Sequence, residues 1–277
     1  EPYDDHLEWE RDGQYFHYLT KWMGALNQVT VVTGDFTYNR WAVELAKAAC
    51  ERFVYTTPSG DRYMYWKMSI DLSRPLVPSM GHHDPLDGFI TFNRLQALAK
   101  KDPEKPAGFD LTGEIAAMAA LCEGRDWTTD DALGLGGLLS ETYRVAKLVA
   151  EGAFHQPGLL LLLINASRVG LESFVGQDPL RYPPAYRLAF RELGLSIGLH
   201  AVEKLDRFVK EMKGILGDAK SLGAGIQALM RYVPVGEMIE EFWLDDAHRR
   251  SGPWLEHQDI NMVMLGTSLL PDTFLSP

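Results

Sequence analysis

Apolar residues recur along most of the chain at intervals of three and four residues, which is the period of an amphipathic α-helix. Over residues 12–29 this pattern selects Tyr15, Leu19, Trp22 and Leu26. Over residues 35–55 it selects an apolar face of Trp41, Leu45, Ala48 and Ala49. Further helices are expected over residues 86–100, 111–123, 130–151, 159–175, 185–210, 221–231, 235–244 and 254–269.

One stretch alternates between apolar and polar residues instead. Residues 62–70 are rich in Tyr, Trp and Met, and the turn-forming sequence Thr-Pro-Ser-Gly occupies residues 57–60 just before them. Alternation next to such a turn is typical of a β-strand in a hairpin. Residues 53–56 are the predicted partner strand.

The predicted helices, about ten in number, are joined by short connectors, so consecutive helices should pack as antiparallel hairpins. No segment rich in Pro, Ser or charge divides the chain, and we therefore expect one all-α domain over residues 1–277. Glycine inside a helix costs about 1 kcal/mol relative to alanine, and close contact between helices would explain its retention. The helical glycines concerned are Gly134, Gly136, Gly137, Gly194, Gly198, Gly223 and Gly225.

Composition narrows the class of protein. The 277 residues are 46% hydrophobic and carry a net charge of −11, which disfavours a nucleic acid partner. The two cysteines, Cys50 and Cys122, are expected to be buried and reduced, as in a cytoplasmic protein. The apolar runs at 115–122 and 159–164 fall short of the ~20 residues that span a membrane, so no membrane association is expected. The chain begins without Met, so an upstream segment could be missing.

The strongest candidate for chemistry is the sequence Gly-His-His-Asp-Pro-Leu-Asp-Gly at residues 81–88, just before a predicted helix. It concentrates two imidazoles and two carboxylates, groups that exchange protons or orient one another near neutral pH. His82, His83, Asp84 and Asp87 are therefore candidate catalytic residues. The alternative is that Asp84 or Asp87 caps the helix beside solvated histidines.

A second candidate is a polar stripe on the first predicted helix, made of Glu10, Gln14, His17 or Tyr18, and Lys21. The stripe could face a pocket or face water. Arg11 lies at its start and could belong to a pocket rim. Candidate substrate-binding residues in this part of the chain are His17, Tyr18, Trp66, Lys67 and Arg11.

A third candidate lies near the C-terminus, where His257 and Asp259 begin an otherwise apolar helix. His257 is a candidate catalytic residue and Asp259 a candidate substrate-binding residue, and they could complete a site with the loop at 81–88. Helix capping by Glu256 or Asp259 is the alternative. A metal site built from His82, His83, Asp84 and His257 is disfavoured because adjacent histidines project differently.

Other polar residues are expected to have structural roles and no part in a functional site. Glu141, Arg144 and Lys147 should form a solvated ladder, and Arg187, Arg191 and Glu192 are expected to behave similarly. His200 should be a hydrogen-bonded histidine in the core or at its boundary. Four aromatic residues could stack on sugar rings but are more typical of a core, namely Trp22, Tyr63, Tyr65 and Trp243.

Two parts of the sequence together resemble a known superfamily. One is Tyr-Phe-His-Tyr-Leu-Thr-Lys-Trp at residues 15–22, followed by Trp-Ala-Val-Glu-Leu-Ala at 41–46. The other is Tyr-Trp-Lys-Met at 65–68, followed by Ser-Met-Gly-His-His-Asp-Pro-Leu-Asp-Gly at 79–88. The combination resembles the six-hairpin glycosidase superfamily, including N-acylglucosamine 2-epimerase-like proteins.

The resemblance implies an (α/α)6 toroid whose inner helices line a central pocket, with a small-molecule carbohydrate as partner and no cofactor. The implied activity is that of a sugar epimerase or isomerase, in which His82, His83 or His257 moves protons at a carbon beside a carbonyl. Lys67 or Arg11 would stabilise the oxyanion. A glycoside hydrolase with two carboxylates is the second possibility, with Asp84, Asp87, Glu10, Asp12 and Asp259 as candidates. A non-catalytic scaffold or sugar-binding protein is the third.

Overall fold

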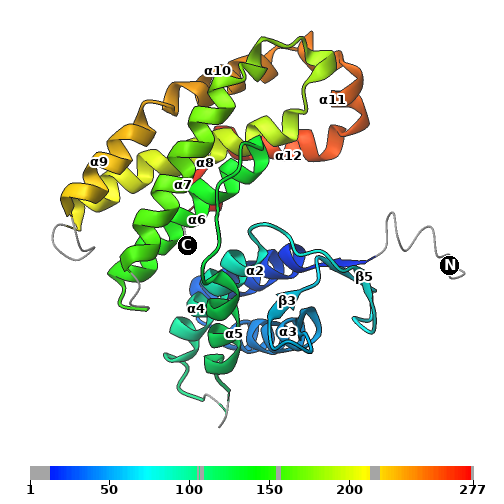
Figure 1. Cartoon of the computed structure of the whole chain (residues 1–277), viewed down its shortest axis with the longest axis vertical. Coiled ribbons are helices and arrows are strands. Elements are labelled where there is room, and N and C mark those ends of the chain that lie inside the picture. Colours follow the sequence, from blue (N-terminus) through cyan, green and yellow to red (C-terminus); the bar gives the residue numbers. More distant parts are fainter. Residues whose placement is uncertain (1–12, 105, 107–108, 154–156, 213–218, 276–277) are drawn as a thin grey trace, which may run out of the picture. The chain divides into compact units, whose positions relative to one another are not determined.

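The computed structural model describes residues 13–104, 106, 109–153, 157–212 and 219–275 (Figure 1). The chain is mostly helical with a short β-hairpin, as predicted. Backbone contacts divide it into two compact units, the first ending at Arg125 and the second beginning at Asp126, and each unit is described by itself. A single domain closed into a toroid therefore stays a prediction.

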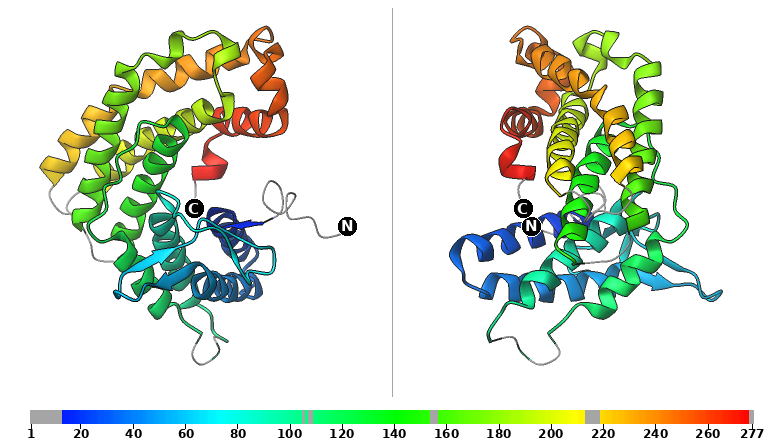
Figure 2. Two further views of the ribbon diagram at one scale, coloured as in Figure 1. Left: turned by 45° about the vertical axis from the view of Figure 1, so that its right-hand side comes forward. Right: turned by 90° about the vertical axis from the view of Figure 1, so that its left-hand side faces the viewer.

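The first unit contains four main helices and several short strands. Helix α2 packs against α3 and α4, and α4 packs against α5 (Figures 1 and 2). Gly88 permits this packing, since an added Cβ there would lie 2.8 Å from the sulfur of Met118 and 3.0 Å from the ring of Phe16. The helices are α2 (Phe16–Thr33), α3 (Thr37–Phe53), α4 (Asp84–Ala99) and α5 (Thr112–Cys122).

The predicted hairpin is confirmed, with strand β2 (Val54–Thr56) pairing antiparallel to β3 (Arg62–Met64). A second sheet was not predicted. It joins β1 (Gln14–Tyr15) to β4 (Lys67–Met68) and β4 to β5 (Pro75–Val77) in antiparallel pairs. Its strands have only two or three residues, too few for a period of two to be visible in the sequence.

The buried face of α2 differs from the predicted one. Trp22 is 65% exposed, whereas Phe16 and Met23 are fully buried. Two polar residues of α2, Asn27 and Thr30, are also buried. Their burial is possible because their side chains are hydrogen-bonded: Asn39 of α3 donates to Asn27 (3.1 Å), and Thr30 donates to the Leu26 carbonyl (3.2 Å). Tyr63 in β3 is also exposed, so the predicted core positions of Trp22 and Tyr63 are wrong. Trp41, on the predicted apolar face of α3, is exposed as well.

In the part that the structure describes, the second unit contains helices and no strands. Helix α8 runs through its centre and packs against α6, α9, α10 and α12. The residues predicted as one helix over 254–269 form two, because the backbone at His257 leaves the helical conformation. The elements are α6 (Ala132–Ala150), α7 (Pro157–Gly176), η1 (Pro179–Arg181), η2 (Pro184–Tyr186), α8 (Ala189–Glu211), α9 (Ala219–Met230), α10 (Val233–Leu244), η3 (His248–Arg250), α11 (Gly252–Glu256), α12 (Gln258–Leu269) and α13 (Asp272–Leu275).

Close glycine contacts join α6 to α8, as predicted for several of the helical glycines. A Cβ added at Gly136 would lie 2.0 Å from the carbonyl oxygen of Gly194, and one added at Gly198 would lie 2.6 Å from the Cα of Gly136. Gly225 also lies against a neighbour, the side chain of Ile164. Gly137 and Gly223 have open space around them, so close packing does not explain those two positions.

Two polar clusters of the second unit are buried, although solvated ladders were predicted. Glu141 is 5% exposed and pairs with Arg144. Arg187 is buried and pairs with Glu192 at 2.6 Å, and Trp243 donates to the same carboxylate at 2.8 Å. The burial of Trp243 is as predicted. His200 is confirmed as a hydrogen-bonded boundary residue, with Glu240 at 2.8 Å and Glu203 at 3.1 Å.

One helix among the described residues, over Gly158–Arg181, is long and apolar enough to cross a membrane by length and composition. Within its most apolar window, 44% of the residues are buried inside the protein. The core helix of a globular protein has the same properties. Its length exceeds the apolar run at 159–164 because the helix continues through mixed sequence to Gly176.

Candidate functional site

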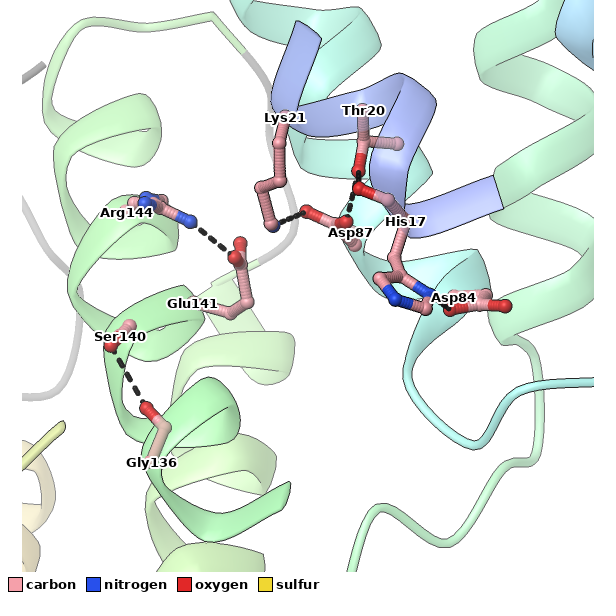
Figure 3. A network of polar contacts seen from close by, with 9 residues as sticks. All are labelled: His17, Thr20, Lys21, Asp84, Asp87, Gly136, Ser140, Glu141 and Arg144. Atoms are coloured by element: carbon pink, nitrogen blue, oxygen red, sulfur yellow. Dashed lines mark hydrogen bonds and ion pairs between the residues drawn. The ribbon is translucent and has the colours of Figure 1, made fainter. Parts of the chain in front are cut away.

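The candidate site lies in the first unit, where the start of α2 faces the start of α4 (Figure 3). Helix α2 contributes His17, Thr20 and Lys21, and α4 contributes Asp84 and Asp87. Both aspartates are buried, with 6% and 7% of their surface exposed. Neither caps the helix, so the capping interpretation of the loop at 81–88 is not what the structure shows.

Asp84 is a buried carboxyl group with few polar neighbours. Its Oδ1 lies 3.9 Å from His17 Nδ1, and its Oδ2 has no hydrogen-bond partner among the described residues. Burial, and then repulsion from Asp87, raise the pKa of Asp84 to about 7, against a smaller opposing effect of Lys21. Both the acid and the base form of this carboxyl are therefore populated near neutral pH.

The absence of a side chain at Gly81 leaves the space that the Asp84 carboxyl group occupies. A Cβ at this position would lie 2.3 Å from Asp84 Oδ2 and 2.5 Å from its Cγ, so any side chain at residue 81 would displace the carboxyl group. The Gly81 carbonyl also accepts the backbone N–H of Asp84 at 3.4 Å. The glycine that precedes the two histidines thus positions the carboxyl group that follows them.

Asp87 lies one turn further along α4 and has strong partners. Lys21 Nζ donates to its Oδ1 at 3.0 Å, and the Thr20 hydroxyl donates to its Oδ2. The Thr20 hydroxyl also lies 2.8 Å from the His17 carbonyl oxygen. An ammonium group at this distance stabilises the ionised carboxylate. The two aspartates of one helix turn therefore have opposite electrostatic surroundings.

His17 connects the acidic pair to solvent. Its side chain is 37% exposed, and burial lowers the pKa of its imidazole, against the attraction of Asp87 and with a further lowering by Lys21. The imidazole is consequently neutral at pH 7 and able to accept a proton. Its Nδ1 and the buried carboxyl of Asp84 form an adjacent base and acid.

Aromatic rings surround His17. The ring of Tyr15 lies 5.5 Å from His17, 5.1 Å from Tyr18 and 5.3 Å from Trp66, measured between ring centres. The rings of Tyr18 and Trp66 are both exposed, at 54% and 39%. Three predicted substrate-binding residues, His17, Tyr18 and Trp66, are thus brought together around Tyr15.

The short unpredicted sheet explains this convergence. Tyr15 of β1 pairs with Lys67 of β4, and the Phe16 N–H donates to the Trp66 carbonyl at 3.4 Å. The Lys67 side chain is 1% exposed, and its ammonium lies 5.1 Å from the centre of the Tyr15 ring. Lys67 is therefore buried beside the Tyr15 ring, and its direct contact with a substrate stays a prediction.

The two histidines of the loop lie close to each other, with ring centres 4.5 Å apart. His82 is exposed, and its carbonyl lies 3.5 Å from Arg125 Nη1. The His83 carbonyl accepts the backbone N–H of Asp87 at 3.0 Å. These contacts establish backbone roles for both residues, and their catalytic roles stay predictions.

The remaining candidates lie elsewhere. Arg11, Glu10 and Asp12 lie outside the described residues. His257 and Asp259 belong to the second unit, where His257 packs edge-on against Phe190 with ring centres 5.4 Å apart and Asp259 is exposed. Their convergence with the loop at 81–88 stays a prediction.

An open hollow of about 440 Å³ adjoins the loop in the first unit. Its lining includes Arg62 and Tyr63 of the hairpin, Met80 just before the loop, and Glu123 and Arg125. Burial raises the pKa of Cys50 to about 11 and that of Cys122 to about 12, so neither thiol is a nucleophile at neutral pH. Among the described residues, no three His, Cys, Asp or Glu side chains form a group that could hold a metal ion.

Sequence reasoning missed two residues of the site. Thr20 looks like an ordinary helix residue, and Tyr15 was assigned to the apolar face of the first helix. Thr20 is three residues after His17, so extending the polar stripe by helical spacing would have included it. No family model, curated protein or solved structure gives a significant match to this chain.

Proposed function

We propose that this protein is a carbohydrate-active enzyme of the epimerase or isomerase type, with His17 and Asp84 as its proton-transfer groups. One observation carries the proposal: a buried carboxyl with an unpartnered oxygen lies beside a neutral, half-exposed imidazole at the edge of exposed aromatic rings. A carboxyl group whose pKa is raised to about 7, beside an imidazole that is neutral at pH 7, is suited to moving a proton at a carbon next to a carbonyl.

The chemistry requires one proton to leave carbon and one to reach oxygen. In an open-chain sugar, His17 takes the proton from C2 while Asp84 gives its proton to the carbonyl oxygen at C1, and the product is an enediol. If the enediol turns over in the site, return of the proton from His17 to the other face of C2, with the proton of the C1 hydroxyl passing back to Asp84, gives the epimer. Return to C1, with loss of the proton from the C2 hydroxyl, gives the ketose. Each route restores both residues to their starting states.

The aromatic rings support a sugar as the substrate class. Tyr18 and Trp66 offer exposed ring faces next to His17, and the apolar faces of sugar rings pack on such surfaces. The sequence resemblance to epimerase-like proteins over residues 15–88 points the same way, although the comparisons above provide no independent match.

A glycoside hydrolase is the second candidate, because a carboxyl whose pKa is raised to about 7 is suited to be the general acid. A hydrolase needs a second carboxylate, about 5–5.5 Å or about 6.5–9.5 Å away, depending on the stereochemical outcome. Asp87 does not suit this role, because Lys21 and Thr20 already hold its oxygens. The described residues therefore favour isomerisation over hydrolysis.

The test is a panel of mono- and disaccharides, screened by thermal shift and then followed chromatographically for products. We expect at least one sugar to stabilise the protein and to be converted to an isomer of the same mass. Replacing both Tyr18 and Trp66 by Ala should weaken its binding about tenfold, whereas Trp41→Ala, which removes an exposed aromatic from α3, should not.

Cleavage of a disaccharide to monosaccharides would contradict the isomerase proposal and support the glycoside hydrolase instead. If no sugar of the panel binds or reacts, the carbohydrate proposal fails, and a non-catalytic scaffold becomes the better account.

A further inference from the structure

Two carboxyl groups share one turn of α4, and each has a different set of neighbours. The groups facing Asp84 are Asp87 on its own helix and His17 and Lys21 on α2. Asp87 accepts from Lys21 and Thr20, whereas Asp84 Oδ2 accepts from no described group. The positive charge and the hydroxyl are thus both directed at Asp87.

This asymmetry decides where the pair keeps its negative charge. Two buried carboxylates close together do not both ionise readily, so the better-solvated member takes the charge and the other keeps the proton. A hydroxyl that can donate to either a carbonyl or a carboxylate forms the stronger hydrogen bond with the charged acceptor. Thr20, with 1% of its surface exposed, therefore reinforces the charge that Lys21 stabilises.

We infer that Lys21 and Thr20 are positioning residues, which fix the negative charge on Asp87 and so keep Asp84 as the proton-carrying member of the pair. The electrostatic part of this inference stands on geometry, and its catalytic consequence rests on the proposed function. Lys21 is half-exposed, so its side chain is also accessible to a bound ligand.

The experiment is a titration of the aspartate carboxyl carbons by ¹³C NMR on the full chain, with the Asp84 and Asp87 resonances assigned from their loss in Asp84→Asn and Asp87→Asn. In Asp87→Asn, which keeps the shape and removes the charge, the midpoint of Asp84 should fall by about one pH unit or more. In Lys21→Met the midpoint of Asp87 should rise, because the ammonium that stabilises its charge is lost. Thr20→Val should also raise the midpoint of Asp87, by less, because it removes a neutral donor.

Lys100→Met is the matched control, since it removes an exposed lysine at the end of α4 and should leave both midpoints unchanged. The inference is overturned if Asp87→Asn leaves the midpoint of Asp84 unchanged, or if Lys21→Met and Thr20→Val leave the midpoint of Asp87 unchanged. Activity provides a separate readout. If the midpoints shift as expected but no sugar is converted, the proposed function fails and the charge arrangement stands.

Where a converted sugar is found, the pH–rate profile should follow the same shifts. A Lys21→Met enzyme whose rate falls equally at every pH, with an unshifted profile, would show that Lys21 has a purely structural role.

Discussion

Asp84 and Asp87 are chemically identical side chains three residues apart, and their surroundings give them different tasks. Asp87 sits between a hydroxyl and an ammonium, and Asp84 sits against the backbone of Gly81 with an oxygen that no described group satisfies. An unsatisfied buried oxygen costs folding free energy, which an enzyme tolerates where a substrate provides the missing partner. The unpartnered oxygen of Asp84 is therefore the feature of a single residue that most directly suggests a site.

The burial of Asp84 should appear in the pH dependence of stability. Its pKa is raised from 3.8 to about 7 in the folded protein, so the folded state holds the proton more tightly than the unfolded chain. Its contribution to stability is therefore complete below about pH 4 and is lost as the pH rises to about 7. The loss is up to about 4 kcal/mol for a shift of this size.

Urea unfolding of wild type and Asp84→Asn between pH 4 and pH 8 measures this effect. The difference in unfolding free energy should change in favour of the variant as the pH rises, and then level off above the folded pKa. Glu44→Gln, which alters an exposed acid on α3, should show no such trend. A constant difference between Asp84→Asn and wild type at all pH values would contradict the raised pKa.

At the scale of elements, the helices were predictable and their buried faces were less so. Helical periodicity located the main helices to within a few residues. It misassigned the inward face of α2, because Thr20, Asn27 and Thr30 are buried there while Trp22 is exposed. Polar residues that satisfy each other across helices, as Asn27 and Asn39 do, conceal a buried face from any count of apolar positions.

The contact of α6 with α8 gives a matched test at two adjacent glycines. Gly136→Ala would push a methyl group into the backbone of Gly194 and should destabilise the protein by about 3 kcal/mol. Gly137→Ala meets open space and should stabilise it by about 0.5–1 kcal/mol through helix propensity. Chemical denaturation measures the free energy of unfolding of both variants. A similar loss of stability in the two would contradict the close crossing of α6 and α8.

The candidate site was predictable in its parts but not in its assembly. The loop at 81–88 and the stripe with His17 and Lys21 were identified from residue types and helical spacing. Their meeting depends on α2 packing against α4 and on a two-residue strand pairing that leaves no periodic signal. Which of several acids would be buried next to which base is a property of packing, and the sequence pattern alone does not contain it.

At the scale of the whole molecule, all the residues of this arrangement belong to the first unit. The second unit has its own core around α8 and its own buried ion pair, Arg187–Glu192. His257 and Asp259, which were predicted to join the site, belong to that second unit. The toroid and its central pocket therefore remain predictions, because both depend on how the two units combine.

The most direct test of the central claim is solvent exchange at carbon, followed by ¹H NMR with the sugar panel in D₂O. If His17 and Asp84 transfer protons, the C2–H signal of the substrate should disappear as deuterium enters the product, with wild type and Glu44→Gln alike. Asp84→Asn should slow this exchange by about a hundredfold or more. A sugar that reacts while keeping its C2 proton, or an Asp84→Asn enzyme that exchanges at the wild-type rate, would contradict the account.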